Sequence, residues 1–398
     1  MAHPHQYRGD VGRPPARDPR HRRPPDPSSV EPLTTATTTI QAQALTEIVV
    51  RCCRDVGLPR ADAEAVAEVL LYANLRGQEG HGLVRLPNYM RRVKNGLAGD
   101  SGRVQPAAGN GPLRRLDADR SIGPAAAIKA ADMSAELGRE HGVAVVALGN
   151  TTHFGPAGFY ARRVAEQGFV SIVTSNGPKW VAPHGAAKAL LGTNPLALGI
   201  PIGDRGPMVF DMATSAIARG KIRRAAAADT PLPEHVAIDS DGRPTTDARA
   251  ALEGSMLPIA GAKGSGLSLA ISMLAIMLAD AQADYEFTTH ATEDDPGKFP
   301  LIGGSVGQVF IAIDPQPLLG DASMARVEDL VDRLHDLPPA KGFEAPRLPG
   351  ETGDAVAAER LADGIPIRTD LLALIAETCR EFDLDSTAAW LEAKHPRD

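Results

Sequence analysis

The sequence predicts a mixed protein of the α/β or α+β class, in which helix-rich ends flank a central region of strands and helices. Helical periodicity dominates residues 38–112 and again residues 315–398, whereas β-branched runs such as Val143–Leu148 gather in residues 113–314. Polar turns follow several of these runs, and α/β proteins place ligands at such turns. Residues 1–37 belong to neither region.

The first third of the chain is expected to be helical. From Thr38 onward apolar residues recur every three or four positions, and Arg60 opens a second helix with an apolar face. A short glycine-flanked segment, Gly80–Arg85, separates it from a third helix at Leu86–Lys94. Gly99–Gly111 is expected to be a loop.

Strands and helices then alternate. The alanine-rich stretch Gly123–His141 predicts a helix, and the β-branched run that follows it is typical of a buried strand. The other expected elements are strands at Arg114–Asp117, Phe169–Thr174, Pro207–Thr214 and Gln308–Asp314, helices at Pro156–Gln167, Ser215–Ala226 and Leu267–Ala279, a hairpin-like turn within Pro231–Asp247, a loop at Tyr285–Gly304, and C-terminal helices at Met324–Leu337 and Ile367–Glu392 with a loop between them.

Length and composition exclude several classes of protein. A chain of 398 residues is too long for one ordinary core, and 43% hydrophobic with 23% charged residues is typical of a soluble globular protein. The net charge of −7 argues against a nucleic-acid-binding protein. Three cysteines without a C-x-x-C pair predict reduced thiols and a cytoplasmic location. The longest apolar run, Leu267–Ala279, is too short to span a bilayer, so no membrane association is expected.

The N-terminal 37 residues are rich in proline and arginine and carry almost no large apolar side chain. Such a segment cannot bury enough surface to offset the entropy lost on ordering, so we expect a disordered tail. It also lacks the apolar stretch of a secretory signal. A dispensable extension is a better explanation of its charge than contact with nucleic acid.

Several common catalytic motifs are missing. No G-x-G-x-x-G, Walker A loop or H-E-x-x-H is present, and no metal site is predicted. One G-x-S-x-G match occurs at Gly303–Gly307, but the residues after it favour a strand, whereas a nucleophile elbow requires a helix there. We interpret it as a chance match in a glycine-rich loop.

Two of the eleven histidines, His81 and His153, lie in turns beside glycines. Histidine exchanges a proton near neutral pH, which interconversion of a carbonyl and an alcohol requires. Arg85 follows His81 by four positions, so both can face one ligand, and a guanidinium suits a carboxylate. The alternatives are two structural histidines and a surface salt bridge.

Two further features are candidates for ligand contacts. Gly261–Gly266 precedes an apolar helix expected to be buried, and a helix N-terminus with Lys263 favours an anion; an ordinary turn is the alternative. Asp211 lies near the end of a strand in apolar surroundings, where a carboxylate needs a partner. It would orient a histidine, hold a cofactor hydroxyl, or cap the helix that begins near Thr214.

Six motifs in order resemble the type-2 malate/L-lactate dehydrogenase family. This family includes sulfolactate and ureidoglycolate dehydrogenases, diketogulonate reductase, and the reductases of Δ1-piperideine-2-carboxylate and Δ1-pyrroline-2-carboxylate. The similarity extends from about Thr38 to Pro366. The motifs are Leu75–Gly77 with His81–Tyr89; His153–Gly155; Gly192–Ala197; Asp211–Ser215 with Ala218–Ile222; Gly242–Asp247; and Lys263–Leu267.

The resemblance implies NAD(P)H-dependent hydride transfer by a homodimer. It also implies a non-Rossmann, mixed-sheet nucleotide-binding domain (113–314) and a helical domain built from both chain ends. By the same resemblance, His81 is the proton donor and acceptor, a role that some members give to the counterpart of His153, and Asp211 assists. Substrate contacts fall on Arg85, Tyr89, His153 and Thr193, and cofactor contacts fall on Asn176, Gly177, Pro178, Asp211, Met212, Ala213, Lys263, Gly264, Gly350, Glu351 and Thr352.

The chain departs from the family at Gly80, where a serine is usual, so the substrate stays open. The leading hypothesis is a small 2-oxo/2-hydroxy acid, the alternative is a cyclic 2-imino acid, and a third hypothesis is a dehydrogenase-like binding protein that has lost activity. The choice between NAD and NADP is also open, with Lys179 and Arg219–Arg224 as candidates for meeting a 2′-phosphate.

Overall fold

The computed structural model describes residues 36–290, 301–303, 305–318 and 320–395. The tail predicted to be disordered therefore lies outside the described residues, except for its last two positions. Thr37 already belongs to a strand, so ordered structure begins slightly before the predicted boundary.

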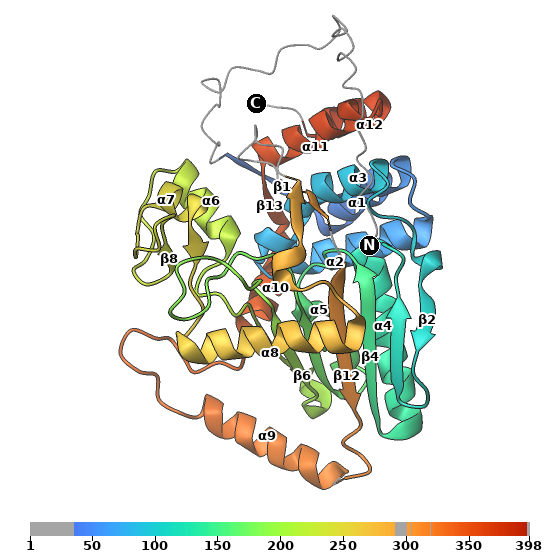
Figure 1. Ribbon diagram of the computed structural model, residues 1–398. Coiled ribbons are helices and arrows are strands. Elements are labelled where there is room, and N and C mark those ends of the chain that lie inside the picture. The colour runs from blue at the N-terminus through green and yellow to red at the C-terminus, as the bar shows by residue number, and fades with distance from the viewer. Residues whose placement is uncertain (1–35, 291–300, 304, 319, 396–398) are drawn as a thin grey trace, which may run out of the picture. The chain divides into compact units, whose positions relative to one another are not determined.

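A seven-stranded mixed sheet forms the centre of the chain, with the strand order β2-β3-β4-β12-β5-β6-β7 (Figure 1). Only β3 and β4 are parallel, and α4 (Gly123–His141) connects them; every other neighbouring pair in this sheet is antiparallel. The strands are β2 (Gln105–Ala108), β3 (Leu113–Asp117), β4 (Val143–Thr151), β5 (Val170–Ser175), β6 (Leu196–Ile200), β7 (Met208–Met212) and β12 (Val306–Ile313).

Helices cover both faces of this sheet. On one face α4 and α5 (Ala157–Ala165) bury alanines and aromatic rings against strand residues such as Val146 and Phe310. On the other face α8 (Ala262–Ala279) crosses the strands, as seen at the front of Figure 1. Gly149 in β4 is needed there, because a Cβ atom at this position would overlap the carbonyl oxygen of Ala279.

Both ends of the chain share one hydrophobic core. It contains Leu45 and Val66 from the N-terminal helices together with Ile365 and Ile375 from the C-terminal segment. The contributing elements are β1 (Thr37–Ile40), α1 (Ala42–Asp55), α2 (Arg60–Leu75), α3 (Leu86–Lys94), α10 (Glu351–Asp363), β13 (Ile365–Arg368), α11 (Thr369–Glu381) and α12 (Asp385–Lys394). β1 and β13 form an antiparallel pair that joins the two ends.

A third, smaller core groups Val181, Leu191, Ile222 and Met256. It lies under α6 (Arg219–Ala227), β8 (Ala237–Ile238), α7 (Ala248–Glu253) and β9 (Ser255–Met256). The other described elements are the antiparallel pair β10 (Thr288–His290) and β11 (Leu301–Gly303), α9 (Asp321–His335), and several one-turn 3-10 helices.

Several expectations about elements were wrong. Residues 37–40 are a strand because three threonines and an isoleucine suit the pairing with β13. The expected loop Gly99–Gly111 contains the edge strand β2, whose residues are all exposed and show no alternation. Strand β6 was not expected, and the expected loop Tyr285–Gly304 contains the paired strands β10 and β11. The expected loop after residue 337 contains α10, which buries only Ala357 and so lacks an apolar face.

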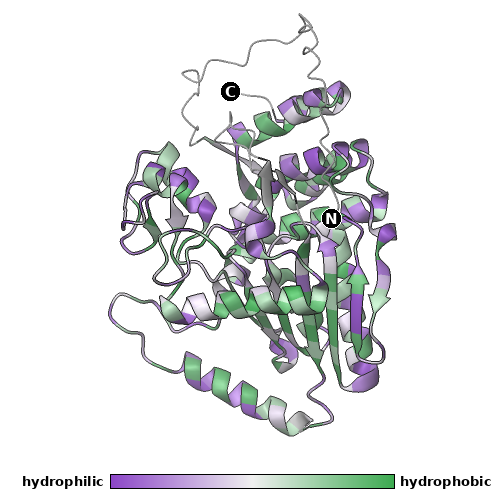
Figure 2. Ribbon diagram, viewed as in Figure 1, coloured by the Kyte–Doolittle hydropathy of each residue, from purple (hydrophilic) through white to green (hydrophobic). Residues whose placement is uncertain are grey.

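The apolar helix α8 also differs from expectation. It begins at Ala262 and not at Leu267, which brings it to 18 residues, and by length and composition alone it could cross a membrane. It is buried on one side only: Met273 and Met277 are 52% and 80% exposed, and Leu269, Leu274, Ile276 and Leu278 are exposed as well. Figure 2 shows this helix as a largely hydrophobic rod across the front of the sheet.

Candidate active site

The segment that carries His81 packs tightly on α2. Two single 3-10 turns, Glu79–His81 and Leu83–Arg85, meet at Gly82. The backbone N–H of Leu83 donates to Oδ1 of the buried Asn74, at 2.6 Å, and a Cβ atom at Gly82 would overlap that same carboxamide. Glycine is therefore required at this position. The bond from Leu83 fixes the segment that carries His81 and Arg85 against α2.

Arg85 is anchored by the backbone of its own turn. Its Nε donates to the carbonyl oxygen of Gly80 at 2.7 Å. A Cβ atom at Gly80 would meet nothing within 4 Å, so the position has room for the side chain of the serine that the resemblance leads one to expect. The anchor uses the backbone carbonyl of residue 80, a group that a serine at this position would also offer.

His153 comes from a different part of the chain, the turn that follows β4. The hydroxyl of Tyr89, on α3, lies 2.8 Å from Nδ1 of His153. The rings of His81 and His153 are stacked, with centroids 5.7 Å apart and planes 9° apart. Three residues predicted for catalysis or substrate binding, His81, Tyr89 and His153, are thus brought together from three elements.

The hydrogen bonds of His153 assign its neutral tautomer. The backbone N–H of Gly155 donates to Nδ1 at 3.3 Å, so Nδ1 is an acceptor, and Tyr89 approaches the same atom with its hydroxyl. A neutral imidazole whose Nδ1 accepts carries its proton on Nε2. The ring consequently offers an N–H donor on its far side.

Both histidines are uncharged near neutral pH. Burial, and then the charge of Arg85, lowers the pKa of His81 from 6.5 to about 3. Burial, followed by Arg85, His81 and Arg92, lowers the pKa of His153 well below its ordinary value. Burial and the nearby Arg223 lower the pKa of Arg85 itself to about 10, so the guanidinium remains charged at pH 7. An anion beside Arg85 would favour the protonated form of His81.

Asp211 lies in β7, opposite Ala197. Its Oδ2 accepts from the backbone N–H of Gly158 at 2.9 Å, which places the carboxylate at the N-terminus of α5. It therefore caps α5, and the expectation of a cap on the following helix was wrong, since α6 begins only at Arg219. Burial raises the pKa of Asp211 from 3.8 to about 6, although the bond from Gly158 lowers it.

The raised pKa of Asp211 predicts a gain in stability for Asp211→Asn. The folded protein binds this proton more readily than the unfolded chain, so the stability contributed by protonated Asp211 is lost as pH rises from about 4 to about 6. Asparagine keeps an oxygen for the Gly158 N–H and carries no charge. We expect the unfolding midpoint to rise by about 2 °C or more at pH 8 and the gain to shrink below pH 5. Thermal unfolding at both pH values measures this, and an equal gain at both would contradict it.

Two of the four segments predicted to contact the cofactor lie side by side. The backbone N–H of Val209 donates to the carbonyl oxygen of Pro349, which brings Gly350 against β7. Gly350 has φ of 100°, and a Cβ atom there would press on the Val209 backbone. A cavity of about 260 Å³ is lined here by Phe210, Asp211, Pro349 and Gly350, among others.

The other two segments lie around α8. Asn176 is buried, Gly177 is partly exposed with open space beside it, and the backbone of Gly192 approaches the Gly177 carbonyl closely. Lys263 and Gly264 lie in the first turn of α8, where Lys263 is exposed. Open backbone at Gly177 and a lysine in the first turn of α8 are features that suit an anionic ligand such as a dinucleotide.

Some of the cofactor and substrate residues have structural bonds of their own. The carboxylate of Glu351 accepts from the Leu348 backbone N–H at 2.8 Å and pairs with His335 at 2.8 Å. Thr352 is exposed on α10. The Thr193 carbonyl accepts from both the backbone N–H and the hydroxyl of Thr214. None of these contacts touches His81 or Arg85.

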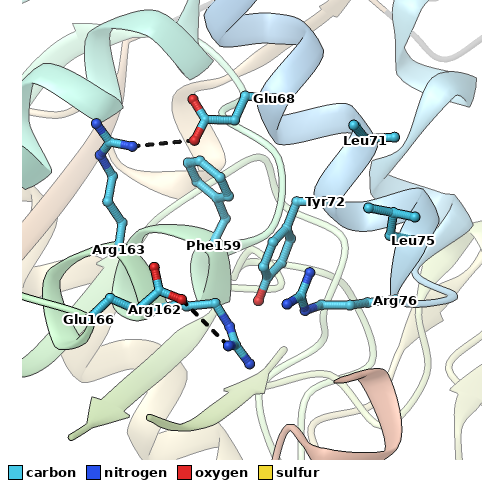
Figure 3. A pocket seen from close by; sticks show the side chains of 9 residues that line it. All are labelled: Glu68, Leu71, Tyr72, Leu75, Arg76, Phe159, Arg162, Arg163 and Glu166. Atoms are coloured by element: carbon cyan, nitrogen blue, oxygen red, sulfur yellow. Dashed lines mark hydrogen bonds and ion pairs between the residues drawn. The ribbon is translucent and has the colours of Figure 1, made fainter. Parts of the chain in front are cut away.

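The side chains between α2 and α5 were not predicted as part of a site. A second cavity, of about 290 Å³, is lined by Tyr72 of α2 among other residues (Figure 3). The Tyr72 ring lies edge-on to Phe159, and the Arg76 guanidinium lies 4.0 Å from its centroid. Arg76 and Arg162 both pair with Asp354, and both also line the cavity beside Asp211. Leu75–Gly77 belongs to the motifs that carry the family resemblance, but the spacing of residues alone does not reveal where the Arg76 side chain points. Neither of these two cavities includes His81 or Arg85.

A model of the malate/L-lactate dehydrogenase family matches residues 40–376. The chain is a member of this family. The match covers most of the chain and includes every predicted site residue, and it confirms the prediction made from the ordered motifs. This malate/L-lactate dehydrogenase family member is an NAD(P)-dependent oxidoreductase, of the class that acts on small 2-oxo/2-hydroxy acids.

Individual relatives show the range of chemistry in the family. The chain is 34% identical over 341 residues to an L-sulfolactate dehydrogenase of Methanocaldococcus jannaschii, covering 85% of this chain and 96% of that protein. It is 36% identical over 307 residues to a (2R)-3-sulfolactate dehydrogenase (NADP(+)) of Chromohalobacter salexigens, covering 77% and 87%. The crystal structure of Δ1-piperideine-2-carboxylate reductase from Pseudomonas syringae matches with a TM-score of 0.75 and 33% identity, over 86% of this chain and all of that chain.

Proposed function

We propose that this enzyme reduces the C2 carbonyl of a small 2-oxo acid, or oxidises the matching 2-hydroxy acid, at the group formed by His81, Arg85, Tyr89 and His153. The observation that carries the proposal is the stacking of His81 on His153 beside an anchored Arg85. The reaction requires a group that binds the substrate carboxylate and a group that transfers a proton. A guanidinium suits the first task and an imidazole the second. When bound, the nicotinamide supplies or takes the hydride.

The residues of this chain have separate tasks in the proposal. Arg85 binds the substrate carboxylate, and the arriving negative charge offsets the guanidinium that helps to keep His81 neutral. His81 then holds a proton more readily and delivers it to the oxygen at C2; in the oxidative direction the neutral ring accepts it. Nε2–H of His153 donates a second hydrogen bond to substrate, with Tyr89 orienting the ring. Donors aimed at a developing negative charge lower the barrier most.

A cyclic 2-imino acid is the second candidate, and one observation favours it. His81 is uncharged in the unliganded protein. An imine nitrogen is more basic than a ketone oxygen, so an imine substrate brings its own proton and needs less from the protein. The solved reductase of a cyclic imino acid among the similar structures supports keeping this alternative.

One screen separates the candidates. Oxidation of NADH and of NADPH is followed with pyruvate, oxaloacetate, sulfopyruvate, phenylpyruvate and the two cyclic imines. Turnover of a 2-oxo acid supports the main proposal, and turnover of imines alone supports the second. Cofactor binding without turnover of any substrate would instead support the third hypothesis, a dehydrogenase-like binding protein. The same screen decides the cofactor preference.

We further propose that residues 113–314 bind the dinucleotide without a Rossmann arrangement. The support is a sheet with a single parallel pair and a sequence without the glycine fingerprint. Residues 38–112 and 315–398 would form the helical domain, which is supported by their shared core. A cytoplasmic location and the absence of nucleic-acid partners stay predictions from composition.

A homodimer in which α8 is covered is also proposed. Six large apolar side chains of this helix are exposed, and such a patch on a soluble protein marks an interface. A second copy is a better partner than a membrane, because α8 packs along a mixed sheet and is one side of a folded core.

Met277→Glu should therefore weaken dimerisation, because it places a charge at the most exposed position of this patch. Sedimentation analysis of the wild type and the variant at micromolar concentration measures the effect. Leu330→Glu, at an exposed leucine of α9, is the matched control and should leave the oligomeric state unchanged. A monomeric wild type, or wild-type binding to lipid vesicles, would contradict the proposal.

A further inference from the structure

Asp284, in a one-turn 3-10 helix between α8 and β10, is 1% exposed, and its side chain accepts four hydrogen bonds. Oδ1 accepts from the Asn176 side chain at 3.1 Å and from the Ser272 hydroxyl at 2.8 Å. Oδ2 accepts from the Gly192 backbone N–H at 2.7 Å and from the Asn194 side chain at 2.7 Å. Each oxygen is thus shared between two donors.

The four donors belong to three segments that are far apart in the sequence. Asn176 opens the predicted cofactor segment Asn176–Pro178. Gly192 and Asn194 stand on either side of Thr193, a predicted substrate contact. Ser272 belongs to α8, whose first turn carries Lys263. The carboxylate is therefore the point at which the cofactor side of the proposed site, its substrate side and α8 are joined.

These bonds set the orientation of two amide side chains. Asn176 also donates to the Gln282 carbonyl at 2.7 Å and accepts from the Gly307 backbone N–H at 2.9 Å. Asn194 also donates to the carbonyl and hydroxyl oxygens of Ser268, at 3.0 and 3.1 Å. Both amides are buried. If a donor replaced an acceptor at Asp284, water could not supply the missing hydrogen bond.

All four donors are neutral, and in the described parts of the chain Asp284 forms no ion pair with a lysine, arginine or histidine. A carboxylate is expensive to bury and needs several hydrogen bonds to be tolerated. Packing alone would favour an apolar residue here. An ionised carboxylate can only accept hydrogen bonds, so it fixes the orientation of every donor around it. The arrangement at Asp284 is suited to that role.

We propose that Asp284 is a positioning residue of the active site, which holds Asn176–Pro178 and Gly192–Asn194 in register so that cofactor and substrate can bind. The inference rests on the proposed function, since it concerns the same site. Asp284 touches neither ligand directly: it acts through Asn176 and through the backbone beside Thr193.

The test is Asp284→Asn, which keeps the shape and replaces one acceptor by a donor. Whichever way the new amide turns, it opposes the side-chain NH2 group of Asn176 or that of Asn194. We expect cofactor affinity, followed by quenching or transfer of nicotinamide fluorescence without substrate, to fall at least about ten-fold, with a similar rise in KM. Ser272→Ala, which deletes one donor and keeps the carboxylate, should give a smaller loss of about two- to three-fold.

Asp62→Asn is the matched control. Asp62 is also buried and accepts from the backbone N–H and the hydroxyl of Ser101, each at 2.6 Å, but none of its partners belongs to the proposed site. It should lower the unfolding midpoint and leave cofactor affinity and KM unchanged. Asp284→Asn should change cofactor affinity and KM in addition to any loss of stability.

The outcomes are distinct. If the Asp284 and Ser272 variants lose stability as the Asp62 variant does, and both bind cofactor as the wild type does, Asp284 is only structural and the inference fails. If Asp284→Asn does not fold, Ser272→Ala alone decides, and unchanged cofactor affinity overturns the inference. A wild type that binds neither NADH nor NADPH would overturn the proposed function and this inference together, whereas normal wild-type turnover with unaffected variants overturns only the role of Asp284.

Discussion

Replacing His81 by asparagine should reduce kcat by roughly 10²–10⁴-fold, the usual contribution of a positioned proton-transfer group. Asparagine is close to histidine in size and offers an N–H donor, but it cannot give up or take a proton. Because His81 lines neither of the two cavities, including the one beside β7, cofactor affinity should stay within about two-fold of the wild type. Steady-state kinetics and a fluorescence titration with the preferred nicotinamide cofactor measure the two effects.

Two further variants complete this experiment. His141→Asn, at the end of α4, changes a histidine remote from the site and should leave kinetics unchanged. His153→Asn should weaken substrate binding with a smaller loss of kcat, because the proposal gives its Nε2–H a hydrogen bond and not the transferred proton. If His81→Asn keeps near wild-type turnover while His153→Asn abolishes it, the proton-transfer role belongs to His153.

Replacing Arg85 by alanine should raise the substrate KM by about ten- to a hundred-fold, since hydrogen bonds to a charged group contribute roughly 1.5–3 kcal/mol. The guanidinium is anchored through Nε to the Gly80 carbonyl, and with a pKa that burial lowers to about 10 it stays charged at pH 7, as binding of a carboxylate requires. Arg85→Lys keeps the charge but loses the planar pair of donors, so an intermediate KM is expected. Initial-rate kinetics with the substrate found in the screen provide the measurement.

The Arg85 variant has a second consequence that tests the electrostatics. Arg85 is the charge that, after burial, keeps the pKa of His81 low. Arg85→Ala should therefore move that pKa upward toward its ordinary value, which NMR titration of the imidazole signals would detect. Arg205→Ala, which breaks a surface pair with Asp332, is the control and should change neither KM nor the titration. An unchanged KM in Arg85→Ala would remove Arg85 from the substrate site.

Elements with a strong local pattern were predicted well. The helices at Arg60, Leu86–Lys94 and Gly123–His141 agree with α2, α3 and α4, because each combines regular apolar spacing with a clear end signal. β2 and α10 were missed, because a short edge strand and a helix with one buried residue leave little periodic trace. β6 was missed although it lies inside the sheet, between β5 and β7, and its burial alternates. α8 was expected to be buried because it is apolar all round, yet the structure exposes one side of it.

The candidate site, like the fold, could be predicted from the sequence only in part. His81, Arg85 and His153 were identified by residue type and turn context, but their stacking and hydrogen bonds depend on segments that only folding brings together. Asp284 gave no signal at all: an aspartate between Ala283 and Tyr285 resembles any loop residue. Its significance comes from four donors that lie twelve or more positions away in sequence.

By itself the sequence determined the family, the kind of chemistry and most residues proposed to perform it. The reason is that an ordered series of motifs, and the reactive side chains in it, can be recognised in the sequence without coordinates. Only the tertiary structure decided that both histidines are neutral, that Asp211 caps α5, that one side of α8 is exposed and that Asp284 joins three segments. Each of these depends on burial and on distances between parts of the chain far apart in sequence, and neither quantity can be computed from neighbouring residues alone.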